Sequence, residues 1–294
     1  MSSANKLAPA AAAGFKDASA YDEHRPAYPG EAVQKLLEHM GLEDRAHARV
    51  VEVAAGTGKF TEALAARHEA FEVRAVEPHP DMRRELEAKK LRGVSVADGS
   101  AQDMRGAVPE GEWGDGCVVA QAFHWFATEE ALDEIYRVLK EGAVLGMIWN
   151  IDDYNKPKSW AASTAWAQHL NDWVHSLAVR DNNPRFRDMA WQHVFAAQIK
   201  SNPVQVLRDT LTNRLPRFSV PIGQDSVEWT HWLGEDALWR RINTLSHVAM
   251  LQGKEREEGE RVFREAMAMP DVVRNEKGEV ECHGQTYIAW TDRM

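Results

Sequence analysis

The stretch VVEVAAGTGKFT, residues 50–61, decides the fold. Its first four residues include three valines, and β-branched apolar residues are typical of a strand buried on both faces of a parallel sheet. Gly56 and Gly58 predict a tight turn, and Lys59–Arg67 predicts a helix after it. A strand, a glycine turn and a helix together place backbone N–H groups and a helix N-terminus around a ligand.

A carboxylate accompanies this turn, because Glu52 lies four residues before Gly56, near the end of the predicted strand. The resulting E-x-x-x-G-x-G pattern resembles motif I of the class I S-adenosylmethionine-dependent methyltransferases. That resemblance implies that Glu52, Ala54 and Thr57 join the two glycines in holding the cofactor. Two alternatives stay open. One is a dinucleotide-binding fold, which wants a third glycine where this chain has Thr61, and the other is a purely structural β–turn–α unit.

Composition limits the classes of function. The chain has 294 residues, enough for a large α/β domain, and its formal net charge of −10 argues against a large nucleic-acid footprint. Two cysteines far apart argue against a disulfide scaffold and a structural zinc site, and they fit a reducing, cytoplasmic location. No apolar run approaches the ~20 residues of a membrane helix. We therefore expect a small-molecule substrate, no nucleic-acid or membrane partner, no metal, and a monomer or homodimer.

A second acidic residue follows the next predicted strand, Phe71–Val76. Glu77 lies at its end, and a carboxylate there can accept two hydrogen bonds from the hydroxyls of a ribose. The alternative is a surface carboxylate at the start of the helix predicted from Pro80. The resemblance adds Pro78 to the cofactor site and implies that Met82 lies near the adenine.

The third predicted strand, Val94–Ala97, leads into a segment that resembles the methyltransferase G-x-A-E motif beside the adenine. Ser100, Ala101 and Gln102 are therefore assigned to the cofactor. Gln102 stands where glutamate is more common in the family, which weakens the case for a side-chain role there. Taken alone, the same residues would form a loop and a helix cap.

The fourth predicted strand, Asp115–Ala120, is followed by QAFHWF. Ligands of this fold lie beyond the carboxyl ends of the strands. That placement assigns Gln121 and Ala122 to the cofactor, and His124 and Trp125 to the substrate. The string resembles the HW segment of a methyltransferase branch that includes the ubiquinone-biosynthesis and trans-aconitate enzymes. The plainer alternative is a packed histidine with one satisfied nitrogen.

The N-terminal region divides into two parts. Residues 1–14 are rich in serine and alanine and predict a disordered tail. The following Tyr-x-x-x-Arg-Pro-x-Tyr-Pro pattern resembles the start of the same methyltransferase branch. It implies a lid in which Tyr21 and Arg25 contact the cofactor and Tyr28 contacts the substrate. A surface entry segment, ending in a helix from Glu31, is the alternative.

The first half of the chain alternates strand and helix five times and ends with the predicted strand Ala143–Trp149. This pattern predicts an α/β fold with a doubly wound, mostly parallel, Rossmann-like sheet. The resemblance implies seven strands with the last one antiparallel. Trp149 and Asn150 end the fifth strand and are assigned to the substrate. The cofactor-binding core with its lid is predicted to span residues 15–150.

The alternation of predicted strands and helices ends after residue 150. Residues 151–216 predict a helical cap inserted after the fifth strand, and residues 217–294 predict completion of the sheet with further cap helices. The expected helices are Ser159–Val179, Arg185–Ile199, Val204–Leu211, Thr230–Arg241, Ile242–Gln252 and Lys254–Met269. Tryptophans at helical spacing indicate core packing and suggest an apolar substrate pocket. His247 is assigned to that pocket on weak grounds.

The resemblance implies transfer of the methyl group of S-adenosyl-L-methionine to an oxygen, or less commonly a nitrogen or carbon, of a small organic molecule. An organic acid or a natural product would fit. His124 is the catalytic candidate: it would act as a general base for a hydroxyl acceptor, or it would orient an acceptor that is already ionised. Two alternatives are a cofactor-binding protein that catalyses a non-methylating rearrangement or cyclisation, and a regulatory module without chemistry.

Overall fold

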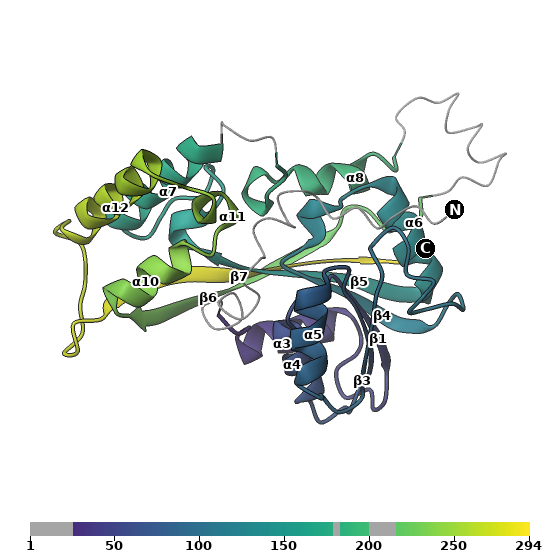
Figure 1. Cartoon of the computed structure of the whole chain (residues 1–294). Helices are drawn as coiled ribbons and strands as arrows, with labels where there is room; N and C mark the ends of the chain where they lie inside the picture. Colours follow the sequence, from purple (N-terminus) through teal and green to yellow (C-terminus); the bar gives the residue numbers. More distant parts are fainter. Residues whose placement is uncertain (1–25, 179–182, 200–215) are drawn as a thin grey trace.

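The protein is described from a computed structural model, which defines residues 26–178, 183–199 and 216–294 (Figure 1). A single seven-stranded sheet runs through its centre. The strands are β1 (Arg49–Val53), β2 (Glu72–Val76), β3 (Val94–Ala97), β4 (Gly114–Ala120), β5 (Leu139–Asp152), β6 (Gly223–Leu233) and β7 (Val280–Asp292). Their spatial order is β3-β2-β1-β4-β5-β7-β6.

Strands β1 to β5 pair in parallel, whereas β7 runs antiparallel to both β5 and β6. The prediction of a doubly wound, mostly parallel sheet with an antiparallel last strand is therefore confirmed. The strand order reverses between β1 and β4, because the chain first builds outward to β3 and then returns to the other side of β1. Ligands of open α/β sheets bind beyond the strand ends at such a switch point.

Helices cover both faces of the parallel half of the sheet. Alternate residues of β1 point to opposite faces, as the pleat requires: Val50 packs with α3 (Gly30–His39) and α4 (Lys59–Ala65), whereas Val51 and Val53 pack with α6 (Glu129–Val138). Helix α5 (Pro80–Ala88) lies on the same side as α4 (Figure 1). This double cover explains why the strands read as nearly continuous apolar runs.

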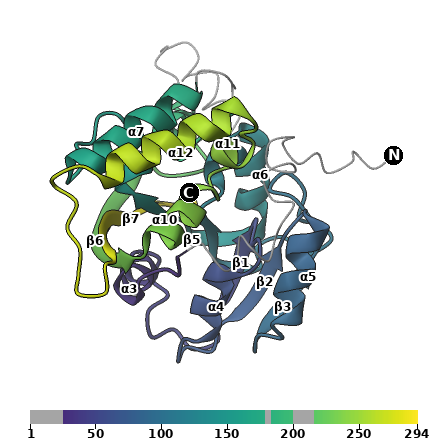
Figure 2. The ribbon, with the colours of Figure 1, turned by 60° about the vertical axis from the view of Figure 1, so that its left-hand side comes forward.

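A separate helical layer covers the far end of β5, β6 and β7 (Figures 1 and 2). It consists of α7 (Ala165–Ala178), α10 (Glu235–Ile242), α11 (Ser246–Ala249) and α12 (Lys254–Met267). These helices share one apolar cluster that includes Trp166, Leu170, Leu238 and Phe263. Because α7 precedes β6 and the other three follow it, the cap is assembled from two chain segments.

Several predicted helices are wrong in extent. Helix α7 begins at Ala165 rather than Ser159. The predicted helix Arg185–Ile199 is broken into η3 (Phe186–Asp188), η4 (Ala190–Gln192) and α8 (His193–Ala196), because Met189 adopts a left-handed backbone with φ of 55°. The predicted helix Val204–Leu211 lies outside the described residues.

The region around β6 departs most from prediction. Residues 230–233, expected to be helical, extend β6, whose antiparallel pairing with β7 continues to Leu233 opposite Val280. This pairing ends the influence of the amphipathic pattern of the following helix, which begins only at Glu235. The expected helix Ile242–Gln252 is reduced to the single turn of α11 and the residues around it.

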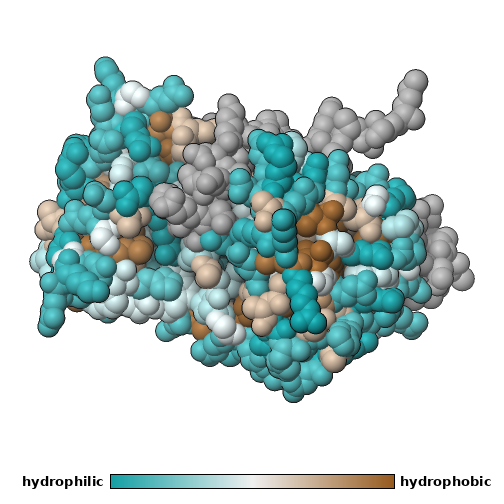
Figure 3. All heavy atoms as spheres, turned by 60° about the horizontal axis from the view of Figure 1, so that its bottom comes forward, coloured by the Kyte–Doolittle hydropathy of each residue, from teal (hydrophilic) through white to brown (hydrophobic). Residues whose placement is uncertain are grey.

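Among the residues that the structure describes, no helix combines the length and the apolar composition needed to cross a bilayer. Figure 3 shows a face on which hydrophilic residues predominate and hydrophobic residues form separate small groups.

Candidate functional site

The turn after β1 has a backbone that restricts its residues. Ala54, Gly56 and Gly58 all have positive φ angles, of 56°, 59° and 91°. Gly58 is also the N-cap of α4, and a Cβ atom there would lie 2.3 Å from Cδ1 of Leu86. Gly58 is therefore required for both conformation and space, whereas a Cβ at Gly56 would meet only Sδ of Met82, at 3.8 Å.

Glu77 connects this turn to the end of β2. One of its carboxylate oxygens accepts the backbone N–H of Gly56 at 2.8 Å, and the other accepts the N–H of His79 at 2.7 Å. Burial raises the pKa of the Glu77 carboxyl, while these two N–H donors and the nearby Arg83 oppose the shift. A carboxylate has about four acceptor positions, so Glu77 can hold the turn and still accept hydroxyl groups of a ligand.

Glu52 lies inside the sheet, beside the same turn, and is completely buried. Burial raises the pKa of its carboxyl to about 8, the Thr61 hydroxyl opposes this shift, and the nearby Glu77 adds to it. Glu52 is therefore a neutral acid at pH 7. Its neutrality lets two acidic residues coexist beside one cofactor site without two buried negative charges.

The remaining cofactor candidates lie around the same strand ends in different environments. The side chains of Thr57, Met82 and Ala101 are buried, and Ala101 packs into the apolar core. Ser100 exchanges two backbone hydrogen bonds with Asp103, which fixes the loop after β3. The partly exposed Pro78 and Ala122 flank the site, whereas the side chain of Gln102 is exposed. Tyr21 and Arg25 lie outside the described residues.

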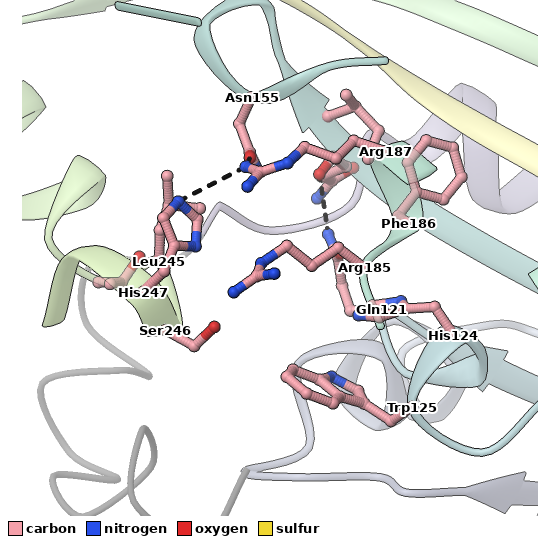
Figure 4. A pocket seen from close by; sticks show the side chains of 13 residues that line it. Gln121, His124, Trp125, Asn155, Arg185, Phe186, Arg187, Leu245, Ser246 and His247 are labelled. Atoms are coloured by element: carbon pink, nitrogen blue, oxygen red, sulfur yellow. Dashed lines mark hydrogen bonds between the residues drawn. The ribbon is translucent and has the colours of Figure 1, made fainter. Parts of the chain in front are cut away.

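A pocket opens beside these strand ends, between the sheet and the cap (Figure 4). Its lining comes from four regions: the ends of β4 and β5, the η2 turn (Asp153–Asn155), the segment around η3, and the residues leading into α11. The lining residues are Gln121, His124, Trp125, Asn150, Ile151, Asn155, Arg185, Phe186, Arg187, Thr244, Leu245, Ser246 and His247. The structure thus brings together the predicted residues Gln121, His124, Trp125, Asn150 and His247.

Two arginines line this pocket, whereas an apolar pocket was expected. Arg187 is 4% exposed; it donates to Oδ1 of Asn155 at 2.7 Å and lies 3.5 Å from Nε2 of His247. Arg185 extends toward Ser246 and Trp125 in Figure 4. The predicted tryptophan stripe on α7 packs instead within the cap.

Sequence reasoning missed Arg185 and Arg187 because they lie in a segment that resembled an ordinary amphipathic helix. Nothing in their spacing distinguishes them from surface arginines. The residues before α11 were missed for a similar reason, since only the long β6–β7 pairing brings them back to the pocket. A cluster assembled from such distant segments leaves no short sequence motif.

Asn150 connects the pocket to the segment before α3. Its side-chain oxygen accepts the Thr286 hydroxyl at 2.7 Å, and its amide nitrogen donates to the carbonyl oxygens of Pro26 and Ala27 at 3.4 and 3.2 Å. Gln121, a non-glycine residue with φ of 61°, donates to the carbonyl oxygen of Asn150 at 3.0 Å. The first described residues are thus held at the floor of the pocket.

Two aromatic candidates lie beside the pocket rather than on its wall. Tyr28 packs edge-on against Phe60, with ring centroids 5.1 Å apart. Trp149 is fully buried, and its indole N–H donates to Nδ1 of His124 at 3.2 Å. Trp149 therefore contacts a pocket residue without lining the pocket.

A possible metal-ligating group was not apparent from the sequence. Asp44, His68 and Glu69 bring their ligand atoms together. These residues precede β1 and β2, so they lie at the amino ends of the parallel strands, whereas the pocket lies at the carboxyl ends. Glu69 is engaged by Arg67, whose guanidinium holds the pKa of this carboxyl down at about 2. The group behaves as an ion-pair network.

The strand order, the glycine turn and the two acidic strand ends together define a Rossmann-like methyltransferase fold. The family model described as "Methyltransferase domain" matches residues 51–147, the stretch from β1 into β5. A solved structure from Anaeromyxobacter dehalogenans, provisionally described as a type II methyltransferase, has a TM-score of 0.56 and 21% identity. The match covers 90% of this chain and 97% of that chain, and it supports the fold alone.

Two relatives extend the match in sequence. An uncharacterized methyltransferase of Mycobacterium tuberculosis is 28% identical over 88% of this chain and 87% of its own length. An uncharacterized methyltransferase-like protein of Schizosaccharomyces pombe is 34% identical over 61% of this chain, and the match spans 63% of that protein. The family model and these relatives are all described as methyltransferases, and they support a class I S-adenosylmethionine-dependent methyltransferase.

Proposed function

We propose that this protein transfers the methyl group of S-adenosyl-L-methionine to an oxygen atom of a small organic acid. The observation that carries the proposal is the pocket at the ends of β4 and β5, which is lined by Arg185, Arg187 and His247. Arginine forms paired hydrogen bonds with a carboxylate through its planar fork of N–H groups. A pocket with two such groups favours an anionic substrate over a neutral, apolar one.

The residues proposed to bind the cofactor lie in the glycine turn and at the ends of β1 and β2. When bound, S-adenosylmethionine supplies an activated methyl group on a sulfonium centre. Gly56 and Gly58 would let the backbone approach the cofactor, and Glu77 would accept the hydroxyls of its ribose while it continues to hold the turn. Glu52, neutral at pH 7, would add no second negative charge there.

The substrate would bind in the pocket that the two arginines line. Arg187 is already oriented by Asn155, so its guanidinium loses little freedom when it binds a carboxylate. Gln121 and Asn150 line the same pocket and lie at the carboxyl ends of β4 and β5. Much of the rate acceleration would come from aligning the acceptor oxygen with the methyl group in a pocket that excludes water.

We also propose the cellular location, the class of partner and the assembly of the enzyme. A small-molecule substrate, a cytoplasmic location and the absence of a nucleic-acid partner are suggested by the acidic net charge and by Cys117 and Cys282, which are both buried free thiols. The proposed assembly is a monomer or a homodimer. The relation to the ubiquinone-biosynthesis and trans-aconitate branch remains part of the proposal.

The test is a turnover assay in which a panel of organic acids is compared with the matched amides, and S-adenosylhomocysteine release is measured. We expect turnover with at least one acid and not with its amide. Arg187→Met should raise KM for the acid by about 10- to 100-fold, the range of a lost charge-assisted hydrogen bond. Equal turnover of an acid and its amide would contradict the role assigned to the arginines.

A further inference from the structure

The hydrogen bond between Trp149 and His124 fixes where the imidazole carries its proton. An indole N–H can only donate, and it donates to Nδ1 of His124 at 3.2 Å, within the usual range for such a bond. Nδ1 must therefore supply a lone pair. In the neutral ring the proton is then on the other nitrogen, Nε2.

Trp149 is held so firmly that it imposes this choice on His124. It lies on β5 with no exposed surface, and its ring packs against Trp191 and Phe186 with centroids 4.7 and 4.9 Å apart. The indole cannot turn away without disrupting this cluster. If Nδ1 of His124 took up a proton, two N–H groups would face each other at a half-buried position, and the indole N–H would lose its acceptor.

We propose that Trp149 is a positioning residue that fixes His124 as a neutral ring with its proton on Nε2, so that His124 donates a hydrogen bond in the substrate pocket and takes no proton from the acceptor. That the pocket binds the substrate rests on the proposed function, whereas the position of the proton on His124 does not. The inference narrows the acceptor to an oxygen that is already ionised, such as a carboxylate.

The chemistry of such an acceptor balances without a base. A lone pair on the ionised oxygen forms the new O–C bond to the methyl carbon, the C–S bond breaks, and its electron pair stays on sulfur. No proton is released, so none has to be accepted. A hydroxyl acceptor would instead need a group to take its proton, and Nε2 of His124 already carries one. Arg185 and Arg187, which line the same pocket, favour the ionised form of the acceptor.

The tautomer is tested directly by nitrogen NMR of the full chain labelled with ¹⁵N-histidine, without any substrate. We expect Nδ1 of His124 to be unprotonated and Nε2 to be protonated at neutral pH, with the signals assigned by their loss in His124→Gln. Trp149→Phe should convert this pattern into a mixture of tautomers. Trp191→Phe is the matched control, since it alters the same aromatic cluster and leaves the indole donor in place. A protonated Nδ1 in the unaltered protein would overturn the inference.

The consequence for the reaction is tested by separating KM from kcat. His124→Ala should raise KM by about 10-fold or more with little change in kcat, and His124→Gln should recover much of the loss because its amide also donates. A fall in kcat by about 10²–10⁴ in both variants would identify a general base and overturn the inference. If no methyl transfer is found at all, the proposed function fails, whereas the NMR result still decides the tautomer.

Discussion

Two parts of the candidate site, the cofactor wall and the substrate wall, carry acidic and basic side chains respectively. The cofactor wall carries Glu52 and Glu77, buried carboxyls whose pKa values are both raised by desolvation. The substrate wall carries Arg185 and Arg187 and is completed by His247. The glycine turn with Glu77 suits a compound that carries a ribose, and the pocket lined by the two arginines suits an anion.

The walls also differ in how the chain builds them. The cofactor wall comes from strand–turn–helix units whose parts are close in sequence, and its key contacts, such as Glu77 to Gly56, join neighbouring strands. The substrate wall is assembled from β5, the η3 segment and α11, which meet only when the cap packs on the sheet. Local geometry should therefore dominate mutational effects on the first wall, and tertiary contacts should dominate those on the second.

The largest expected effect lies where the cap meets the sheet. Arg241 on α10 and Asp152 at the end of β5 form a buried ion pair, with Nη2 and Oδ1 2.7 Å apart. Arg241→Met should lower the free energy of unfolding by about 3–5 kcal/mol, because it leaves the Asp152 charge buried and unpaired. Denaturant unfolding measures this loss. The double variant with Asp152→Asn is the control and should recover most of it. A single variant as stable as the unaltered protein would show that the cap does not depend on this pair.

A somewhat smaller effect should separate the two glycines of the turn. Gly58→Ala combines a positive φ with an overlap against Leu86, and should cost roughly 2–4 kcal/mol of stability. Gly56→Ala meets no close atom and should cost only about 1–2 kcal/mol of backbone strain. Thermal unfolding of the two variants checks the order. The reverse order would mean that the turn is not shaped as described.

Cofactor affinity should depend on Glu77. Glu77→Ala should weaken binding of S-adenosylhomocysteine by about 1.5–3 kcal/mol, the range for hydrogen bonds to a charged group. Calorimetry measures the loss, and circular dichroism confirms that the variant is folded. Gln102→Ala serves as the control, because the Gln102 side chain is exposed and its removal should leave affinity unchanged. Unaltered affinity in a folded Glu77 variant would remove the ribose assignment.

A dependence of stability on pH should also follow from the buried carboxyl of Glu52. Its folded pKa of about 8 lies above the ordinary value of 4.5, so the folded state binds the proton more tightly than the unfolded state. The stabilisation is fully present below pH 4.5 and is lost as pH rises through 8, by about 1.4 kcal/mol per pH unit between them.

Glu52→Gln should remove that dependence, since the amide keeps the shape and does not ionise. Unfolding free energies of the two proteins, measured across this pH window, should diverge as pH rises, with the variant more stable at the alkaline end. Parallel curves would mean that Glu52 titrates normally.

The contrast between the walls also explains what could be predicted from the sequence. The valines of β1, the glycine turn and Glu77 carry local signals, and the structure places them at the strand ends where ligands of this fold bind. Arg185 and Arg187 carry none, because their position depends on the left-handed residue Met189 and on the packing of the cap. His247 was found only as a weak candidate on an expected longer helix.

Secondary structure near the cap was also predicted incorrectly where long-range pairing determines it. Residues 230–233 have the tryptophan and threonine content of a strand, yet the amphipathic pattern that follows favoured an earlier helix start. Pairing with β7 settles the outcome in favour of β6. Long-range hydrogen bonding of this kind has no counterpart in a local sequence window.

The most direct measurement follows the methyl group itself. The protein is incubated with organic acids and S-adenosylmethionine that carries a trideuterated methyl group, and the products are analysed by mass spectrometry. We predict that one of the acids gains the labelled methyl group as an ester, with one S-adenosylhomocysteine released for each product. Arg187→Met should form much less of this ester when the acid is present well below the raised KM. A product without the label, or a rearranged substrate of unchanged mass, would contradict methyl transfer in this pocket.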